Sequence, residues 1–266
     1  MSMNLSNKVL AITGSTGGLG QALAHSISAK GAQLVLIGRQ ADRLKALADT
    51  LDGSPRWITV ENLADSADVV TLAQQLRDME VDVLVNNAGI NEFACFRNLS
   101  ETDLDAIIGV NLLSPMKLTL ALIDHLTERR GMVVNVGSAY GFIGYPGHSA
   151  YCASKFGLRG FSEALYREMN GLGLKVIYAA PRAIDTPMND ARVVGLNTEL
   201  GNHADSPSVV AEAIIRQIES ESHRSVMGAP EAFFAKLNGF LPRLVDWALM
   251  KKAETVRTWA ILPNKE

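Results

Sequence analysis

Thr13-Gly14-Ser15-Thr16-Gly17-Gly18-Leu19-Gly20 forms a glycine-rich turn that indicates the fold more clearly than any other part of the chain. The β-branched, apolar run Val9–Thr13 leads into it, and a helical pattern of apolar residues from Ala22 to Ile27 follows at once. Glycine permits a tight turn and lets backbone amides approach a phosphate closely, and a helix N-terminus attracts anions. A plain tight turn is the alternative explanation. The position between a first strand and a first helix favours a dinucleotide-binding loop.

The rest of the chain repeats this alternation of strand and helix. Helical stretches with one apolar face, such as Leu72, Ala73, Leu76 and Met79, separate most of the apolar runs. Such alternation predicts a parallel sheet covered by helices on both faces. We therefore expect an α/β fold with a doubly wound, Rossmann-type parallel sheet of about seven strands. The expected strands are Val9–Thr13, Gln33–Ile37, Arg56–Val60, Asp82–Asn86, Met132–Gly137, Lys175–Ala180 and Arg224–Met227.

The end of the second expected strand distinguishes between two cofactors. NAD sites often place an acid there, which accepts hydrogen bonds from the ribose 2′-hydroxyl. Gly38 stands at that end here, and Arg39 follows it. A guanidinium binds a 2′-phosphate through paired hydrogen bonds, and no acid at the strand end opposes it. A solvated surface arginine is the alternative, but the pattern favours NADP(H) as the cofactor.

Composition limits the classes of partner and location. The chain has 266 residues, 47% hydrophobic and 20% charged, with a net charge of −3, which is typical of a soluble globular protein without a nucleic-acid partner. We see no signal peptide and no apolar run long enough to span a membrane. Cys95 and Cys152 have no metal-ligand spacing. We therefore expect a cytoplasmic protein with reduced thiols and no metal site.

Five motifs, taken in order and spacing, resemble the short-chain dehydrogenase/reductase family in its ordinary single-domain branch. They are TGSTGGLG at 13–20, NNAG at 86–89, Asn111, Ser138, and Tyr151-Cys152-Ala153-Ser154-Lys155. The resemblance covers roughly residues 6–228. It implies a single NADP(H)-binding oxidoreductase domain over residues 1–266 that forms a homodimer or homotetramer.

The resemblance also assigns residues to the cofactor. Gly14, Gly18 and Gly20 would shape the phosphate loop, and Ser15, Thr16 and Leu19 would line it. Asn62 and Leu63 match the pair that contacts adenine, although aspartate is commoner at the first of these positions. Asn87, Ala88 and Gly89 would border the adenine ribose, while Pro181, Ile184 and Thr186 belong to the segment that holds the nicotinamide carboxamide.

The segment after the sixth strand departs from the family pattern. The family usually has Pro-Gly there, and this chain has Pro181-Arg182. The loss of glycine puts the local backbone path in doubt, because only glycine adopts a positive φ at low cost. Arg182 either brings a cation near the nicotinamide or points outward, and we favour the outward orientation.

Three side chains carry the expected chemistry. Tyr151 and Lys155 are four residues apart and therefore share one face of a helix. A neighbouring ammonium lowers the pKa of a phenol from about 10 toward the range that general acid–base catalysis requires. Ser138 follows the fifth strand, at the carboxyl edge where ligands of such sheets bind, and its hydroxyl would bond the substrate oxygen. By resemblance, Asn111 would sit in the fourth helix and hold a water that links Lys155 to solvent.

These assignments predict an NADP(H)-dependent oxidoreductase that interconverts a ketone and a secondary alcohol, with Tyr151 as general acid or base. A non-catalytic NADP(H)-binding sensor or scaffold on the same fold is the main alternative, since fold does not dictate function. The intact set of Ser138, Tyr151 and Lys155 argues against it. A sugar-nucleotide epimerase or dehydratase fits less well, because its relatives usually carry longer C-terminal substrate domains. His148 either lines the pocket or is structural, and we favour a structural role.

Two segments should determine substrate and assembly. Residues 187–206 show no clear regular element and match the position of a substrate lid, whose apolar residues favour a hydrophobic ketone. Residues 229–266 extend the chain beyond many relatives, with Pro242 between two short helices. Three interpretations of this extension remain open: packing on its own domain, a subunit contact, or an interfacial membrane helix. Lys251 and Lys252 are the best basic residues that the membrane interpretation offers.

Overall fold

Parallel strands run through the centre of the protein in the order β3-β2-β1-β4-β5-β6-β7. The computed structural model describes residues 3–262, and all seven strands of the sheet pair in parallel. Their bounds are β1 Val9–Thr13, β2 Gln33–Gly38, β3 Arg56–Thr59, β4 Val83–Asn86, β5 Met132–Val136, β6 Lys175–Ala180 and β7 Arg224–Val226. The predicted fold class is confirmed, and each expected strand differs from the observed one by at most one residue at either end.

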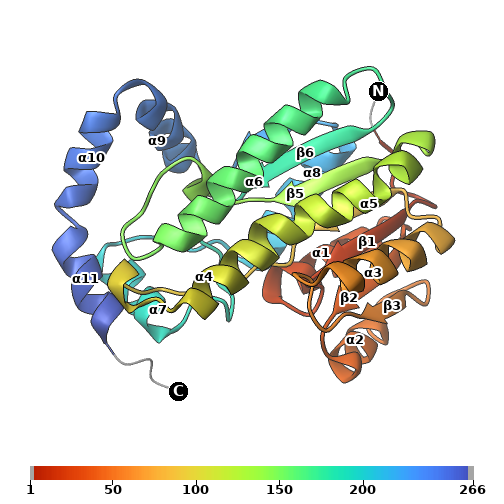
Figure 1. Cartoon of the computed structure of the whole chain (residues 1–266), viewed down its shortest axis with the longest axis horizontal. Coiled ribbons are helices and arrows are strands. Elements are labelled where there is room, and N and C mark those ends of the chain that lie inside the picture. Colours follow the sequence, from red (N-terminus) through yellow and green to blue (C-terminus); the bar gives the residue numbers. More distant parts are fainter. Residues whose placement is uncertain (1–2, 263–266) are drawn as a thin grey trace.

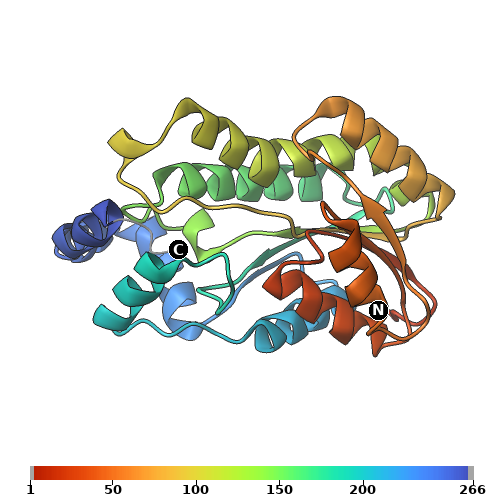
Figure 2. The ribbon, with the colours of Figure 1, turned by 90° about the horizontal axis from the view of Figure 1, so that it is seen from below.

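Helices cover both faces of this sheet, as Figure 2 shows. One face packs against α3 (Ser66–Asp78), α5 (Ser114–Glu128) and α6 (Ser149–Glu168), and the other against α1 (Gly18–Ser28) and α8 (Pro207–Glu219). The strands can serve both layers because successive side chains point to opposite faces. In β1, Leu10 and Ile12 join the core on the α1 side, whereas Val9 and Ala11 join the core on the α3 side. The remaining helix beside the first strands is α2 (Ala41–Ala48).

A long, irregular helical stretch runs from Glu101 to Glu128. It consists of α4 (Glu101–Ile108), a π-helical turn at Gly109–Leu113, and α5. By length and composition alone this stretch could cross a membrane, but in α5 Leu118, Leu122 and Leu126 are fully buried against the sheet. It therefore serves as a core helix of the domain. Asn111 lies in the π-helical turn and not in a regular fourth helix, which corrects the expectation from the family resemblance.

The segment after β6 contains a helix that the sequence did not indicate. α7 spans Ala191–Glu199, so the expectation of no regular element in residues 187–206 is wrong. The Asp190 side chain caps this helix by accepting a hydrogen bond of 3.0 Å from the Val193 amide. Val193 and Leu196, three residues apart, bury one face of it. The stretch is too short and its apolar stripe too narrow for periodicity alone to reveal it.

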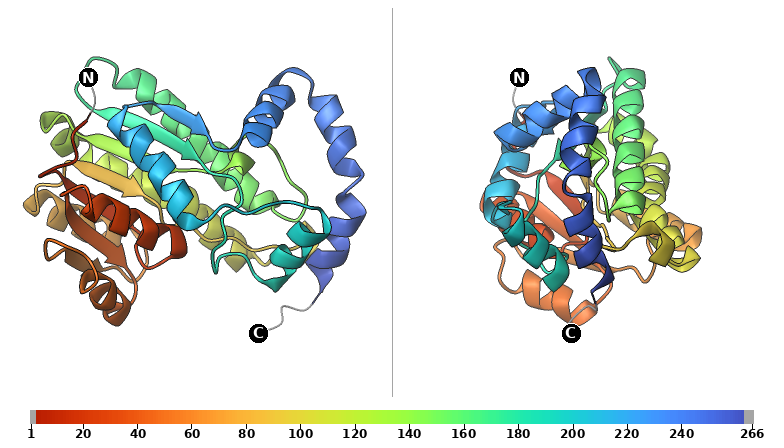
Figure 3. Two further views of the ribbon diagram at one scale, coloured as in Figure 1. Left: turned by 180° about the vertical axis from the view of Figure 1, so that it is seen from behind. Right: turned by 90° about the vertical axis from the view of Figure 1, so that its left-hand side faces the viewer.

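Three helices follow β7 and form one end of the molecule (Figure 1). They are α9 (Ala229–Phe240), α10 (Pro242–Met250) and α11 (Ala253–Ile261). Pro242 begins α10, as expected for a residue that starts a helix but cannot continue one. α11 packs against α7, with Val256 and Ala260 buried beside Phe93. Figure 3 shows α10 and α11 across the side of the molecule that lies beyond the carboxyl ends of the strands.

Candidate functional site

The glycine-rich turn leaves no room for side chains at its three key positions. Gly14 has a φ of +65°, and a Cβ built on it would lie 2.8 Å from the Ala88 Cα. A Cβ on Gly18 would lie 2.7 Å from the Thr186 Cγ2 atom. A Cβ on Gly20 would overlap the Gly14 carbonyl oxygen. Only glycine therefore fits, and the backbone at the start of α1 is open for a phosphate, as a dinucleotide requires.

Side chains beside this turn hold it in place. The Asn87 side-chain amide donates hydrogen bonds to the carbonyl oxygens of Thr13, at 2.9 Å, and Gly14, at 3.2 Å. The Thr13 hydroxyl accepts from the amides of Asn87 and Ala88, both at 3.0 Å. Ser15 differs from its predicted role, because its side chain is fully buried and its hydroxyl accepts a bond of 2.7 Å from the Ile37 amide. Ser15 thus joins β1 to β2 and does not line the pocket.

A cavity of about 1510 Å³ opens at the carboxyl edge of the sheet. Pockets for one drug-sized ligand usually measure about 300–1,000 Å³, so this cavity has room for a dinucleotide and a second molecule. Except for Ser15 and Asn111, every residue that the sequence analysis assigned to the site lines it. These lining residues are Gly14, Thr16, Gly18, Leu19, Gly20, Arg39, Asn62, Leu63, Asn87, Ala88, Gly89, Ser138, Tyr151, Lys155, Pro181, Ile184 and Thr186.

Two arginines stand at the end of the cavity beside β2. Arg39 follows the strand, and Arg43 lies four residues later in the first turn of α2. The Arg43 guanidinium donates a hydrogen bond of 3.0 Å to the carbonyl oxygen of Thr16, which fixes it beside the glycine turn. Arg43 was not among the predicted site residues. The available signal was a second arginine in the first turn of the helix that follows β2, five residues after the strand end.

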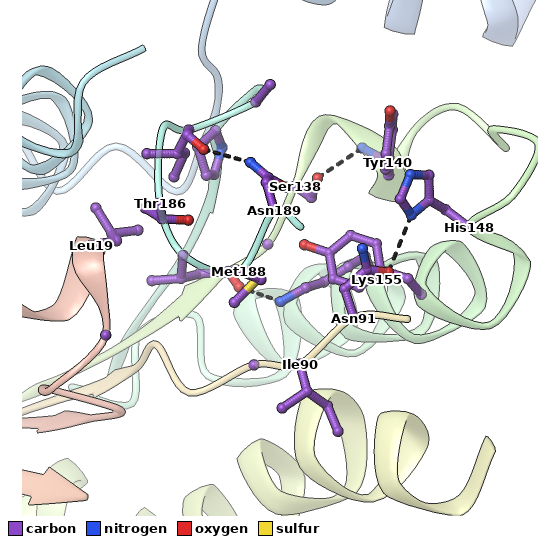
Figure 4. A pocket seen from close by; sticks show the side chains of 18 of the residues that line it. Leu19, Ile90, Asn91, Ser138, Tyr140, His148, Lys155, Thr186, Met188 and Asn189 are labelled. Atoms are coloured by element: carbon purple, nitrogen blue, oxygen red, sulfur yellow. Dashed lines mark hydrogen bonds between the residues drawn. The ribbon is translucent and has the colours of Figure 1, made fainter. Parts of the chain in front are cut away.

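Ser138, Tyr151 and Lys155 meet at the other end of the cavity, as predicted from their spacing. Tyr151 and Lys155 share one face of α6, and the Lys155 Nζ atom lies 5.6 Å from the centre of the Tyr151 ring. Lys155 donates a hydrogen bond of 2.9 Å to the Val136 carbonyl oxygen at the end of β5. Ser138 follows β5, and its hydroxyl accepts a bond of 3.1 Å from the Tyr140 amide. Figure 4 shows Ser138 and Lys155 on neighbouring sides of the pocket.

Burial shifts the pKa values of both Tyr151 and Lys155. It raises the pKa of Tyr151 to about 12, against the opposing effect of a hydrogen bond with Ser138. Burial also lowers the pKa of Lys155 to about 8. Lys155 was expected to lower the pKa of Tyr151, whereas desolvation of the buried phenol has the largest effect and raises it. Tyr151 is fully protonated at neutral pH and thus available as an acid.

Asn111 connects two segments of the site by hydrogen bonds. Its side chain is completely buried, and its amide donates hydrogen bonds to the Ile90 carbonyl oxygen, at 2.8 Å, and to the Ser154 hydroxyl, at 3.1 Å. The Ile90 amide donates to the Asn111 Oδ1 atom at 2.8 Å. Asn111 thereby ties the chain after β4 to α6, the helix that carries Tyr151 and Lys155. It acts as a positioning residue at the back of the cavity.

Aromatic side chains form the wall beside Tyr151. His148 is 4% exposed, and its ring centre lies 4.9 Å from that of Phe93 and 5.3 Å from that of Tyr140. Tyr140 stacks in turn on Tyr145 at 5.1 Å. Burial lowers the pKa of His148 to about 4, so its imidazole is neutral at physiological pH. His148 lines the cavity, and its Nδ1 atom lies 3.2 Å from the Asn91 Oδ1 atom (Figure 4).

Arg182 does not point outward, so the orientation we favoured from the sequence is wrong. Its guanidinium pairs with both carboxylate oxygens of Asp205, one of them at 2.8 Å, and lies 3.8 Å from Glu231. The backbone there needs no positive φ, since Arg182 is absent from the positive-φ residues of the described chain. Arg182 therefore joins three segments: the end of β6, the start of α8 and the first turn of α9. These two carboxylates neutralise the charge of the Arg182 guanidinium.

The C-terminal helices complete the cavity wall. Phe234 from α9 and Val245, Ala248 and Leu249 from α10 line it, as does Lys252. The sequence predicted a role in substrate or assembly for residues 229–266, but no motif indicated which of their side chains reach the cavity. They make the end of the cavity beyond Tyr151 mostly apolar.

Three comparisons with known proteins agree with this arrangement. A family model described as short chain dehydrogenase matches residues 8–195. Nodulation protein G from Rhizobium sp. (strain N33) is 37% identical over 189 residues, which cover 70% of this chain and 77% of that protein. The 3-oxoacyl-[acyl-carrier-protein] reductase FabG of Escherichia coli (strain K12) is 32% identical over 192 residues, covering 71% of this chain and 78% of the reductase.

Solved structures extend the likeness over most of the chain. A short-chain dehydrogenase from Streptomyces avermitilis matches with a TM-score of 0.79 and 28% identity, over 94% of this chain and 99% of the other. A short-chain dehydrogenase from Sphingobium yanoikuyae in complex with NADPH matches with a TM-score of 0.76 and 24% identity, over 90% and 95%. One from Burkholderia phymatum in complex with NAD gives 0.82 and 20%, over 91% and 96%. The last two show the fold alone.

Proposed function

This chain belongs to the short-chain dehydrogenase/reductase family, and we propose that it is an NADP(H)-dependent oxidoreductase that interconverts a ketone and a secondary alcohol. The observation that carries the proposal is the shape of one cavity. It has Arg39 and Arg43 at one end, the glycine turn in the middle, and Ser138, Tyr151 and Lys155 at the other end. These are the groups that a dinucleotide with a 2′-phosphate requires.

The residues of this chain supply orientation and a proton. A bound nicotinamide nucleotide supplies the hydride. The Ser138 hydroxyl bonds the carbonyl oxygen of the substrate, and Tyr151 donates a proton to the same oxygen. Since burial raises the pKa of Tyr151 to about 12, the phenol is a full acid at neutral pH, which suits the direction of ketone reduction. Lys155, with a pKa lowered to about 8, provides a positive charge below that pH that stabilises the developing phenolate.

The substrate we propose is a hydrophobic ketone. The cavity beyond Tyr151 is bordered by Phe234, Val245 and Leu249, together with the stacked rings of Tyr140 and Tyr145. Apolar walls with a few polar groups at the reacting atom favour an apolar ligand held at its carbonyl. FabG of Escherichia coli, by its name, reduces a 3-oxoacyl group, which is also a ketone.

We further propose a homodimer or homotetramer in the cytoplasm. On α5, Leu120 is 74% exposed and Met116 is 36% exposed, and Leu113 immediately before the helix is 42% exposed. By resemblance to members that pair through their fourth and fifth helices, this apolar face suits a subunit contact.

A spectrophotometric screen of NADPH oxidation over a panel of ketones, including bulky cyclic ones, tests the activity. On any ketone that is reduced, kcat/KM is then compared for NADPH and NADH in the wild type, Arg39→Ala, and Arg39→Ala/Arg43→Ala. We expect a preference for NADPH, and a loss of about 10- to 100-fold with NADPH alone in the double variant. Lys45→Ala is the matched control, because Lys45 is an exposed cation of α2 outside this cavity.

Equal efficiencies with the two cofactors in the wild type would refute the NADP(H) assignment. NADPH binding without oxidation on any ketone would instead support a nucleotide-sensing or scaffold protein.

A further inference from the structure

α9 and α10 carry an exposed face of large apolar side chains on the outside of the molecule. We define this outer face as Phe233, Lys236, Phe240, Arg243, Leu244, Trp247, Met250 and Lys251. Its apolar members are far more exposed than core residues: Phe240 by 85%, Met250 by 73% and Trp247 by 58%. On α10, Arg243, Trp247 and Met250 recur at helical spacing, so they form one continuous stripe.

The opposite side of the same helices is held firmly by the domain. Val245 is 3% exposed, and Ala248 and Leu249 line the cavity on the same side of α10. α9 is fixed by the Asn238 side-chain amide, which donates a hydrogen bond of 2.9 Å to the Phe142 carbonyl oxygen. The outer face therefore has a defined orientation on the domain, and Figure 3 shows the helices that carry it at the far end of the molecule.

Cations alternate with the apolar side chains on this face. Lys236, Arg243 and Lys251 belong to it, and the Lys251 Nζ atom lies 3.3 Å from the centre of the Trp247 ring. Asp246 is the exposed acid of α10. The sequence shows the same bias: residues 229–266 hold six Lys and Arg residues against four Asp and Glu residues, while the whole chain holds 25 against 28. The extension carries a net positive charge, whereas the chain as a whole carries a net negative charge.

This combination of charge and apolar surface distinguishes between two occupants of the face: a second copy of this chain and an anionic lipid bilayer. In a symmetric dimer the same patch meets itself, so the cations of one copy would face those of the other and oppose association. An anionic bilayer surface matches both features. Lys and Arg side chains attract anionic headgroups, Trp prefers the interface, and Phe, Leu and Met enter the acyl boundary. We propose that the outer face of α9 and α10 docks on an anionic lipid bilayer, with α10 lying in its surface.

Such docking has a consequence for the substrate, and this part rests on the proposed function. The inner side of α10 borders the cavity through Val245 and Leu249, so the helix that touches the bilayer also forms the cavity wall. A lipophilic ketone dissolved in the bilayer would reach the cavity without crossing bulk water. Lipid binding itself is measured without any substrate, so the docking proposal is tested separately from the enzymatic one.

The experiment is flotation of the full-length protein with phosphatidylcholine vesicles, with and without phosphatidylglycerol. Two variants alter the outer face: Arg243→Glu/Lys251→Glu reverses charge, and Leu244→Ser/Trp247→Ser removes apolar area. Their matched controls are Lys45→Glu on α2 and Val70→Ser/Val209→Ser on α3 and α8, at exposed positions elsewhere. Thermal unfolding verifies that each variant is folded, and light scattering reports its mass.

We expect flotation with the phosphatidylglycerol vesicles that falls with added salt and is about tenfold weaker without the anionic lipid. Both outer-face variants should lose about tenfold or more in binding, and both controls should match the wild type. Absence of wild-type flotation, or equal flotation of all variants, would overturn the proposal. A fall in mass of Leu244→Ser/Trp247→Ser without lipid binding by the wild type would assign the face to a subunit contact instead.

Discussion

At the glycine turn, on the cofactor side, the wall of the cavity is backbone, whereas at the catalytic end it is side chains. Gly14, Gly18 and Gly20 make the first wall by having no Cβ, and the side chains of Thr13 and Asn87 only hold that backbone in place. The second wall consists of Tyr151, Lys155, His148 and the apolar residues of α9 and α10. The first wall depends on the absence of Cβ atoms. The second depends on side chains that come from segments far apart in the sequence.

The difference explains where each end tolerates change. At Gly14 and Gly20 an added methyl group meets main-chain atoms that cannot rotate away, and at Gly18 it meets the Thr186 side chain. A side-chain wall can repack, so single substitutions there should act through charge, protonation or the loss of an anchor. Changes at the two ends should therefore differ in the size and the kind of their effects.

Truncation after Pro230 removes most of the helical extension and should be the most damaging change. It strips α11 from Phe93, Val193 and Leu196, and it removes Val245 and Val256, which are 3% and 0% exposed. Each buried valine contributes about 1.5–3 kcal/mol in gross transfer free energy, so we expect an aggregated or markedly less stable protein. Thermal unfolding and light scattering make the measurement, with truncation after Leu262 as control. Unchanged melting temperature and mass per assembly would show that the extension is dispensable.

Gly20→Ala tests the backbone wall with a single methyl group. The new Cβ would overlap the Gly14 carbonyl oxygen, so the turn must shift away from the geometry that cradles a phosphate. We expect a loss of about 1–3 kcal/mol in unfolding free energy and a weaker Kd for NADPH, measured by fluorescence titration. Gly144→Ala is the control, because a Cβ there meets nothing within 4 Å. Equal NADPH affinities for the two variants would contradict the steric account.

The pH dependence of stability tests the part that His148 plays in the side-chain wall. Its pKa in the folded protein is about 4, below the ordinary 6.5, so the unfolded chain binds more protons between these values. Stability is therefore fully present above pH 6.5 and is lost as the pH falls toward 4, by up to about 3 kcal/mol. Denaturant unfolding at neutral and acid pH should show a smaller acid loss in His148→Asn than in the wild type. His25→Asn, at an exposed position, should keep the wild-type loss; an identical loss in all three would exclude His148 as its source.

Arg182→Met should have the smallest effect. It removes the ion pairs with Asp205 and Glu231, in which the Arg182 side chain is 26% exposed, so about 1 kcal/mol of stability is at stake. Because these pairs anchor the base of the 187–206 segment, we expect KM for the ketone to rise about two- to fivefold with little change in kcat. Arg224→Met, which removes a more exposed pair with Glu163, is the control. A fall in kcat with unchanged KM would contradict this anchoring role.

The backbone end was predictable from the sequence, because local sequence determines it. A glycine that must lack a Cβ is visible as a glycine, and the strands are visible as β-branched apolar runs between helical patterns. The spacing of Tyr151 and Lys155 likewise placed both on one face of α6. Ser15 was the exception. Its polarity suggested a ligand, whereas its hydroxyl bonds the neighbouring strand.

The side-chain end was less predictable, because it depends on contacts between segments far apart in sequence. The pairing of Arg182 with Asp205 and Glu231 requires three chain segments to meet. The pKa of Tyr151 depends on burial, which motif spacing does not show. Arg43 was accessible from the sequence in principle, as a second arginine in the first turn of the helix that follows β2.

Tyr151→Phe tests the central claim most directly, by removing one hydroxyl from the catalytic end and nothing from the cofactor end. On a ketone that the wild type reduces, NADPH oxidation is followed under single-turnover conditions, and NADPH affinity is measured by fluorescence on the same preparation. The account predicts a fall in the oxidation rate of about 10²–10⁴-fold, with NADPH affinity within about tenfold of the wild type. A Tyr151→Phe protein that keeps most of the wild-type rate would contradict it.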